Sequence, residues 1–376
     1  MSDPALLAAA PVADAGEGPE EGLAIALSGG GYRAMLFHVG VLWRLYDCGL
    51  LQQADRISSV SGGSITSAVL ALAWKRLQWG DGGASFAREV AEPIHRLAGR
   101  TIDIPTILLG LPLHNSGRFV ARCYRKHLFG KATLQDLPEQ PRFVFNATEL
   151  HSGTLWRFSR PYMGSWKLGR RSWPDVRLAT AVAASSGFPP FLSPVRLRFR
   201  PSPETPGDGT MRLPRRVRLT DGGVYDNLGL ETVWKRYRTL FVSDGGATLP
   251  EQKRPCPFYV PQTLRALAIM QNQVGALRTR QLIGSLLAAD GPLARNGAAF
   301  AIATDPAKAP IAPTLPCPSD CARDLAATKT ALRALDDKWR KRLVNWGYAI
   351  SDARIRQFHD SALAVPEGFP YPECGV

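Results

Sequence analysis

Residues 56–64 read Arg-Ile-Ser-Ser-Val-Ser-Gly-Gly-Ser, and this stretch decides the fold. Its first four residues predict a short strand, and residues 64–74 predict an almost wholly apolar and therefore buried helix. A serine at such a turn is lifted out of the sheet when small residues lie two positions before and after it. Ser59 and Gly63 are those small residues, so Ser61 is a candidate nucleophile on an elbow. Taken alone, this pattern is a weak signal, because serine and glycine are common in loops.

The residues upstream repeat the same order of elements. Residues 23–27 read Leu-Ala-Ile-Ala-Leu, which predicts a buried parallel strand, and apolar positions at helical spacing predict a helix over residues 33–46. Strand, helix, strand, helix in this order implies parallel strands joined by right-handed crossovers. We therefore expect a three-layer α/β/α fold with a mainly parallel central sheet. Further strands are predicted at residues 143–148, 155–159, 218–220 and 239–243.

Three consecutive glycines, Gly29, Gly30 and Gly31, lie between the first strand and the first helix. Consecutive glycines allow backbone N–H groups to point at one spot, which is the requirement for an oxyanion hole. The two common phosphate-loop patterns, Gly-x-x-x-x-Gly-Lys-Ser/Thr and Gly-x-Gly-x-x-Gly, are absent here, and this argues against a nucleotide site. A third signal is Asp221-Gly222-Gly223 after a predicted strand, which by itself describes a plain turn.

Together and in this order, the three signals resemble the patatin-like phospholipase family. The resemblance runs from about residue 23 to about residue 231 and includes the blocks 147–150 and 184–191. It implies that Ser61 is the nucleophile and Asp221 its base. It also implies that the backbone of Gly29, Gly30 and Gly31 lines the oxyanion hole, with Arg33 beside it. Two positions depart from the family pattern, Ser59 in place of the elbow's first glycine and Ala34 in place of a glycine after the basic residue. Both replacements are small, so we expect activity to survive.

A catalytic dyad without histidine needs an unusually basic carboxylate. A free aspartate has a pKa of about 3.9 and is a poor base at neutral pH. Burial beside Ser61 is expected to raise the pKa of Asp221, which then takes the serine proton during attack and later activates water. This chemistry requires no cofactor and no metal ion. The close pair Cys317 and Cys321 has no second cysteine or histidine cluster, so we interpret the two as ordinary loop residues.

The expected reaction is the release of fatty acid from phospholipids or lysophospholipids, a substrate preference that rests on the resemblance alone. One alternative is a general esterase, thioesterase or acyltransferase with the triad Ser61, Asp221 and His359, the single histidine after Asp221. Another is a non-catalytic protein that keeps the fold and binds a membrane or a protein partner. His38 lies on a predicted helix, where a hydrogen-bonded core histidine is the favoured interpretation.

The charge of the chain predicts an anionic partner. The net charge is +14 and the pI is about 9.8, while 45% of the 376 residues are hydrophobic, enough for a large core. Nucleic acid is not expected, since no reading motif accompanies the basic residues. An anionic membrane surface is a candidate partner at two places. One is the basic segment around Lys338, Arg340, Lys341 and Arg342, for which a helix C-terminus is the favoured alternative explanation. The other is a group of arginines flanking the predicted loop 201–214, namely Arg196, Arg198, Arg200, Arg215, Arg216 and Arg218.

The organisation of the chain is expected to be simple. Residues 1–21 predict a flexible tail and residues 22–376 a single hydrolase domain, with a C-terminal helical portion from about residue 260. A helix that includes Trp339 and Trp346 is expected to stop at Gly347. Neither a signal peptide nor a membrane-spanning stretch is recognisable, so a cytoplasmic protein, at most peripheral at the membrane, is expected. The apolar stretch 104–113 suggests either core packing or a lipid-facing lid.

Overall fold

The computed structural model describes residues 19–103, 116–190, 192–198, 214–246, 249, 251–308 and 313–376. The apolar stretch 104–113 and nearly all of the predicted loop 201–214 lie outside these residues, as do residues 1–18 of the predicted tail. Glu20 and Glu21, which were also predicted as tail, belong to the first strand.

Within the described residues, ten strands form one sheet in the order β10-β9-β1-β2-β3-β4-β5-β6, with β8 beside β3 and β7 beside β8. The strands from β10 to β3 are parallel, and those beyond β3 are antiparallel. The predicted strands are all present, whereas β5, β6 and β10 had not been predicted. The bounds are β1 Glu20–Leu27, β2 Ala54–Val60, β3 Arg142–Glu149, β4 Thr154–Phe158, β5 Tyr162–Ser165, β6 Gly169–Ser172, β7 Val195–Arg198, β8 Arg216–Asp221, β9 Tyr237–Asp244 and β10 Asn296–Ala301.

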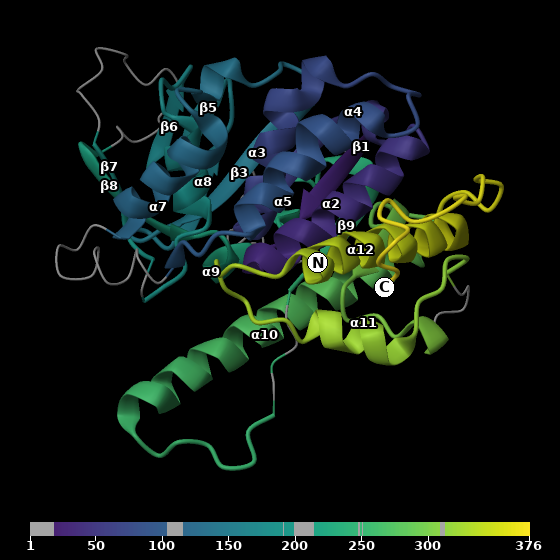
Figure 1. Cartoon of the computed structure of the whole chain (residues 1–376). Coiled ribbons are helices and arrows are strands. Elements are labelled where there is room, and N and C mark those ends of the chain that lie inside the picture. The colour runs from purple at the N-terminus through teal and green to yellow at the C-terminus, as the bar shows by residue number, and fades with distance from the viewer. Residues whose placement is uncertain are drawn as a thin grey trace.

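Helices cover both faces of the sheet (Figure 1), and the predicted three-layer α/β/α fold is confirmed. One face carries the larger hydrophobic core and the helices α2 Gly31–Asp47, α3 Gly62–Ala73, α5 Glu92–Ala98, α7 Ser116–Tyr124, α8 Leu178–Ser185 and α12 Asp337–Phe358. The other face is covered by a smaller core, to which residues 228–234 and the end of α10 Tyr259–Leu286 contribute. Two short helices, α4 Ala84–Phe86 and α11 Ser319–Ala326, lie at the periphery, and α9 Gly223–Asp226 follows β8.

Helices α2 and α12 pack closely because two glycines lie at their crossing. A methyl group on Gly40 would lie 1.9 Å from the carbonyl oxygen of Val344, and one on Gly347 would lie 2.1 Å from that of Phe37. The prediction that Gly347 ends the helix is therefore wrong, because this glycine allows close packing and α12 continues to Phe358. A buried ion pair between Arg44 and Asp352, 2.9 Å long, joins the same two helices.

The basic segment at residues 338–342 lies at the beginning of α12, so its placement at a helix C-terminus was wrong. Two of its four cations instead pair with acidic neighbours. Lys341 pairs with Asp337 and Glu373 at 3.0 Å each, and Arg340 pairs with Asp337 at 3.2 Å. These contacts offset the charges of Arg340 and Lys341 within the molecule.

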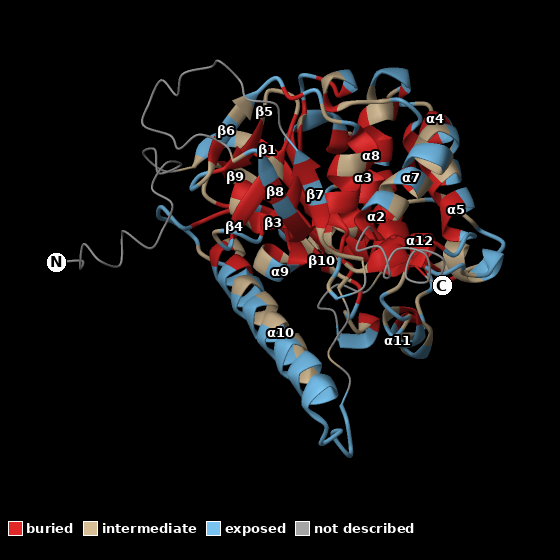
Figure 2. Ribbon diagram, turned by 90° about the vertical axis from the view of Figure 1, so that its left-hand side faces the viewer, coloured by how far each residue is buried: buried red, intermediate tan, exposed pale blue. Residues whose placement is uncertain are grey.

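Helix α10 has a different setting from every other long helix. It projects away from the body of the molecule, and its exposed surface extends to the tip (Figures 1 and 2). Only Leu282 and Ser285 of its 28 residues are buried. Among the described residues, no helix combines the length and the apolar character that crossing a membrane requires.

Candidate active site

The turn between β2 and α3 holds Ser61 in a strained backbone conformation. Its φ is 51°, a region that residues other than glycine seldom occupy. The turn packs directly against the glycine loop. The N–H of Gly63 donates to the carbonyl oxygen of Ser28 at 3.1 Å, and a methyl group on Gly62 would lie 2.3 Å from the carbonyl oxygen of Gly31. The sequence after Ser61 therefore needs glycine, because two backbones meet there.

Serine hydroxyls hold this turn in place. Ser59 is buried, and its hydroxyl donates to the carbonyl oxygen of Val144 at 3.3 Å and accepts from Ser64 at 3.1 Å. The serine at the elbow's first small position thus has partners for its hydroxyl. Ser185, which sequence reasoning did not single out from its block, accepts the N–H of Ser61 at 3.1 Å. Its hydroxyl donates to the carbonyl oxygen of Asn146 at 2.6 Å, so it ties the elbow to β3.

Asp221 is the last residue of β8 and lies opposite Ala147 of β3. This antiparallel pairing brings the residue to the sheet end at which the elbow lies, although 160 positions separate it from Ser61 in the sequence. The carboxylate is buried, and its Oδ1 accepts the N–H of Gly223 at 2.7 Å. Its Oδ2 has no hydrogen-bond partner among the described residues.

Burial raises the pKa of Asp221 to about 7, and the N–H of Gly223 and the side chain of Ser61 oppose that rise. Ser61 is thus near enough to act on the carboxylate, although no hydrogen bond of ordinary geometry joins the two side chains. Catalytic hydrogen bonds are often long without substrate and tighten when it binds. An aspartate with this pKa is a proton acceptor suited to neutral pH.

The glycine loop lies next to Ser61. A methyl group on Gly29 would lie 3.1 Å from Cβ of Ser61, so the two residues are neighbours. The N–H of Gly29 is already used, since it donates to the carbonyl oxygen of Asn227 at 3.0 Å. The N–H groups of Gly30 and Gly31, at the start of α2, have no acceptor among the described residues. Asn227 carried no recognisable signal in the sequence.

Arg33 follows the loop but is directed into the protein. Its side chain is buried, its Nε donates to the carbonyl oxygen of Gly245 at 3.0 Å, and its Nη1 donates to that of Thr328. Burial lowers the pKa of Arg33 to about 10, and Asp244 opposes this effect. These contacts hold the start of α2 against two later segments of the chain, so Arg33 supports the position of the glycine loop.

Neither histidine considered from the sequence reaches the dyad. His38 is buried, with Nδ1 2.7 Å from the hydroxyl of Ser243 and Nε2 2.9 Å from the carbonyl oxygen of Ser28, which confirms its interpretation as a core histidine. Burial lowers its pKa to about 4. His359 is exposed and packs edge-on against Phe241 with ring centroids 5.0 Å apart. Among the described contacts, none joins His359 to Ser61 or Asp221.

The described cysteines and acidic residues do not gather as a metal site would require. All six cysteines are free, and burial together with the neighbouring Cys321 raises the pKa of Cys317 to about 12. In the part of the chain that the structure describes, no three side chains of histidine, cysteine, aspartate or glutamate gather as metal ligands would.

Solved structures with a similar fold include human GIVD cytosolic phospholipase A2. Its TM-score is 0.53 at 15% identity, and the likeness covers 91% of this chain and 60% of the human one. The same human protein in complex with methyl gamma-linolenyl fluorophosphonate gives a TM-score of 0.53 at 14% identity, covering 91% and 59% of the two chains. VipD from Legionella pneumophila has a TM-score of 0.37 at 13% identity, covering 92% and 67%, and this likeness is too weak to carry an argument.

The chain therefore spans about three fifths of the human enzyme's length, and this likeness concerns the fold. No curated protein sequence matches the chain. The model of one family, patatin-like phospholipase, matches residues 25–234, which are more than half of the chain and include Ser61 and Asp221. The chain belongs to the patatin-like phospholipase family.

Proposed function

We propose that this protein is a serine lipid acyl hydrolase in which Ser61 is the nucleophile and Asp221 is the general base. The observation that carries the proposal is the buried Asp221 carboxyl, with a pKa of about 7 and an unpartnered Oδ2, beside a serine on a strained turn. A buried polar atom without a partner costs about 1–3 kcal/mol, more when charged, and such sites are common where chemistry takes place.

The reaction follows from the positions of these two residues. The hydroxyl oxygen of Ser61 attacks the carbonyl carbon of the ester while Asp221 takes the hydroxyl proton. The tetrahedral intermediate then collapses, and the alcohol leaves with that proton. A water molecule, deprotonated by Asp221, attacks the acyl group on Ser61, and the fatty acid departs as the serine regains its proton.

The negative oxygen of the tetrahedral intermediate needs preorganised donors. The free N–H groups of Gly30 and Gly31 at the start of α2 support this role, and the helix terminus adds a favourable field. Gly29 is not a donor to this oxygen, because its own N–H donates to the carbonyl oxygen of Asn227. Its contribution is the space that a residue without a side chain leaves beside Ser61. Loss of one such donor costs about 3–4 kcal/mol of barrier in known hydrolases.

Helix α10 supports action at an anionic lipid surface. Its tip exposes Phe258 and Tyr259, 73% and 88% accessible, and the basic pair Lys253 and Arg254 precedes them by a few residues. Apolar and aromatic side chains beside cations are typical of segments that lie in the headgroup region of a membrane. Farther along the helix, Gln271 donates to the carbonyl oxygen of Gly223 at 3.0 Å, so the projecting helix contacts the turn that follows Asp221.

The favoured substrate is a phospholipid or lysophospholipid, in line with the family. The triad alternative has less support, because His359 contacts Phe241 and neither member of the dyad. A purely membrane- or partner-binding role has less support as well, since both members of the dyad are present and adjoin each other.

Fatty-acid release from mixed phospholipid vesicles, with EDTA present, tests the proposal. Ser61→Ala and Asp221→Asn are each expected to lower the rate by about 10³-fold or more, because either change removes the dyad. His359→Ala is the matched control and is expected to keep the wild-type rate. Loss of activity in His359→Ala would favour the triad. A wild-type protein that binds vesicles and releases no fatty acid would contradict lipid ester hydrolysis.

A further inference from the structure

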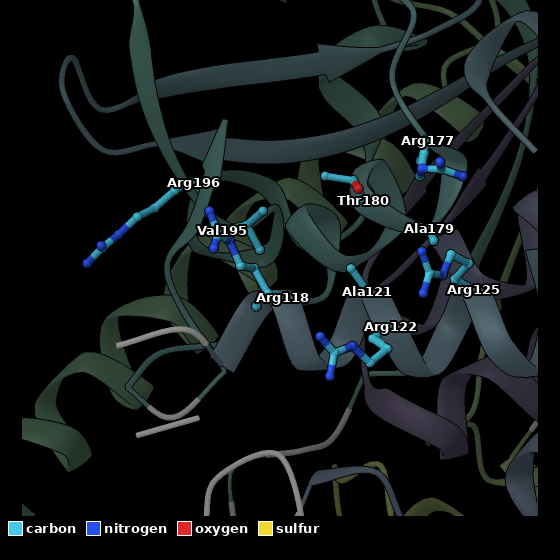
Figure 3. Close-up of a pocket in the computed structure, with 10 residues that line it drawn as sticks. Arg118, Ala121, Arg122, Arg125, Arg177, Ala179, Thr180, Val195 and Arg196 are labelled. Carbon is cyan, nitrogen blue, oxygen red and sulfur yellow. The ribbon is translucent and has the colours of Figure 1, made fainter. Parts of the chain in front are cut away.

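A cavity of about 310 Å³ lies between α7, α8 and β7. Its lining includes three arginines from α7 and the residue after it, one from the start of α8 and one from β7 (Figure 3): Arg118, Arg122, Arg125, Arg177 and Arg196. No member of the proposed catalytic dyad lines it. The prediction of an arginine group near β7 and β8 included only one of these five residues, Arg196.

These arginines differ from others on the surface in lacking acidic partners. Arg76 pairs with Glu89 at 2.7 Å and Arg96 with Glu92 at 3.3 Å, whereas none of the five pairs with a carboxylate among the described residues. Positions 118, 122 and 125 also share one side of their helix, where like charges four residues apart destabilise it. The described side chains thus leave this concentration of positive charge without acidic partners.

The cavity is formed by close packing around it. Gly117 brings α7 against β7, since a methyl group there would lie 2.4 Å from Cγ2 of Val195. Thr180 places a hydroxyl-bearing side chain in the wall opposite α7, in the first turn of α8 (Figure 3). A volume of about 310 Å³ falls at the lower end of the range for small-molecule sites.

We infer that this cavity binds a ligand carrying more than one phosphate group. Guanidinium groups bind phosphate oxygens through paired, charge-assisted hydrogen bonds, and five of them exceed what a single phosphate requires. A lipid headgroup and a soluble polyphosphate share this chemistry. The inference goes beyond the proposed hydrolysis and does not depend on it.

The cavity is connected to the elbow through one short helix. Helix α8 begins at the cavity with Leu178 and ends at Ser185, whose hydroxyl accepts the N–H of Ser61. Eight helical residues span about 12 Å. The proposed ligand site therefore lies at one end of α8 and the nucleophile at the other.

Calorimetric titration of the full chain with tripolyphosphate tests the site. The wild type and Ser61→Ala are expected to bind it equally, which separates this inference from the proposed reaction. The double variant Arg118→Gln/Arg122→Gln is expected to bind at least tenfold more weakly, because glutamine keeps helix propensity while removing two charges. The control Arg76→Gln/Arg96→Gln removes two partnered arginines and is expected to bind like the wild type. Circular dichroism checks folding, and Arg177→Gln/Arg196→Gln replaces the first pair if that variant does not fold.

Vesicle binding separates the two sources of phosphate. Vesicles containing cardiolipin, with two phosphates per molecule, are compared with phosphatidylglycerol vesicles of equal surface charge. A preference for cardiolipin that is lost in Arg118→Gln/Arg122→Gln supports a lipid headgroup, and binding of tripolyphosphate without that preference supports a soluble ligand. Failure to bind tripolyphosphate together with no cardiolipin preference would overturn the inference. Equal weakening of tripolyphosphate binding in Arg118→Gln/Arg122→Gln and in the control Arg76→Gln/Arg96→Gln would overturn it as well. Such a result would reflect the net charge of the protein alone.

Discussion

Helices α2 and α10 are both long and both rich in apolar residues, but their surroundings are opposite. Every residue of α2 except Asp47 is buried, and the helix is enclosed by the sheet and α12. In α10 only Leu282 and Ser285 are buried, and apolar residues such as Leu267 and Leu277 face outward. The spacing of apolar residues therefore predicts a helix in both cases. It does not show whether other parts of the protein bury that helix.

The difference between the two helices corresponds to two tasks. In our proposal, the close packing of α2 fixes the free N–H groups of Gly30 and Gly31, because an oxyanion hole needs such preorganisation. Helix α10 projects from the same fold and contacts the turn after Asp221 through Gln271. In our proposal the first helix serves the chemistry and the second serves contact with lipid.

The largest expected effect is on stability at the crossing of α2 with α12. Gly40→Ala places a methyl group 1.9 Å from a backbone oxygen, so we expect a loss of about 3 kcal/mol or more in the free energy of unfolding. Gly275→Ala on α10, where no atom lies within 4 Å of the added methyl group, is expected to stabilise by about 0.5–1 kcal/mol. Urea denaturation measures both. Equal effects of the two substitutions would contradict the contrast between the helices.

The next effect concerns the loss of folding stability that results from burying the charged carboxylate of Asp221. The pKa of Asp221 is raised from its ordinary value to about 7, so the folded state binds more protons than the unfolded state between about pH 4 and 7. The free energy of unfolding therefore falls as the pH rises through this window, and above it the full cost is present. Asp221→Asn removes the charge while its side-chain oxygen still accepts from Gly223. We expect a gain of about 2–4 kcal/mol near pH 8 that vanishes near pH 4.

Denaturation at several pH values measures this gain. The control is Asp290→Asn, an exposed position just after α10, which is expected to leave stability unchanged at every pH. A gain for Asp221→Asn that did not vary with pH would argue against a raised pKa.

The smallest effect on stability is expected at the tip of α10. Phe258→Ser together with Tyr259→Ser removes exposed apolar surface that touches no core, so the free energy of unfolding should change by less than about 0.5 kcal/mol. Binding to anionic vesicles, measured by co-sedimentation, should weaken about tenfold or more, because the two aromatic side chains would no longer be buried in the lipid. Unchanged vesicle binding would remove α10 from the proposed membrane contact.

Local patterns in the sequence predicted much of the fold and several residues of the candidate site. The strand at residues 23–27, the elbow at Ser61 and the helix after it are each encoded within a few neighbouring residues. The resemblance added Asp221, which no local pattern could join to Ser61, because β8 reaches the elbow through long-range antiparallel pairing with β3.

Features that depend on distant partners could not be predicted. Gly347 was predicted to end its helix, because the sequence alone does not show that this glycine packs against Phe37 of another helix. Ser185 and Asn227 act through hydrogen bonds to segments far away in the sequence. The arginine cavity combines residues from three elements, so only Arg196 had been noticed as part of a basic group.

Labelling with a long-chain alkyl fluorophosphonate, followed by peptide mass spectrometry, tests the central claim most directly. The reagent forms a covalent bond to an activated serine oxygen with loss of fluoride. We predict one adduct on Ser61, with a rate that rises with pH through about 7 as Asp221 ionises, and at least 10²-fold slower labelling in Asp221→Asn. An adduct on another residue, or labelling of Asp221→Asn at the wild-type rate, would contradict the Ser61–Asp221 dyad.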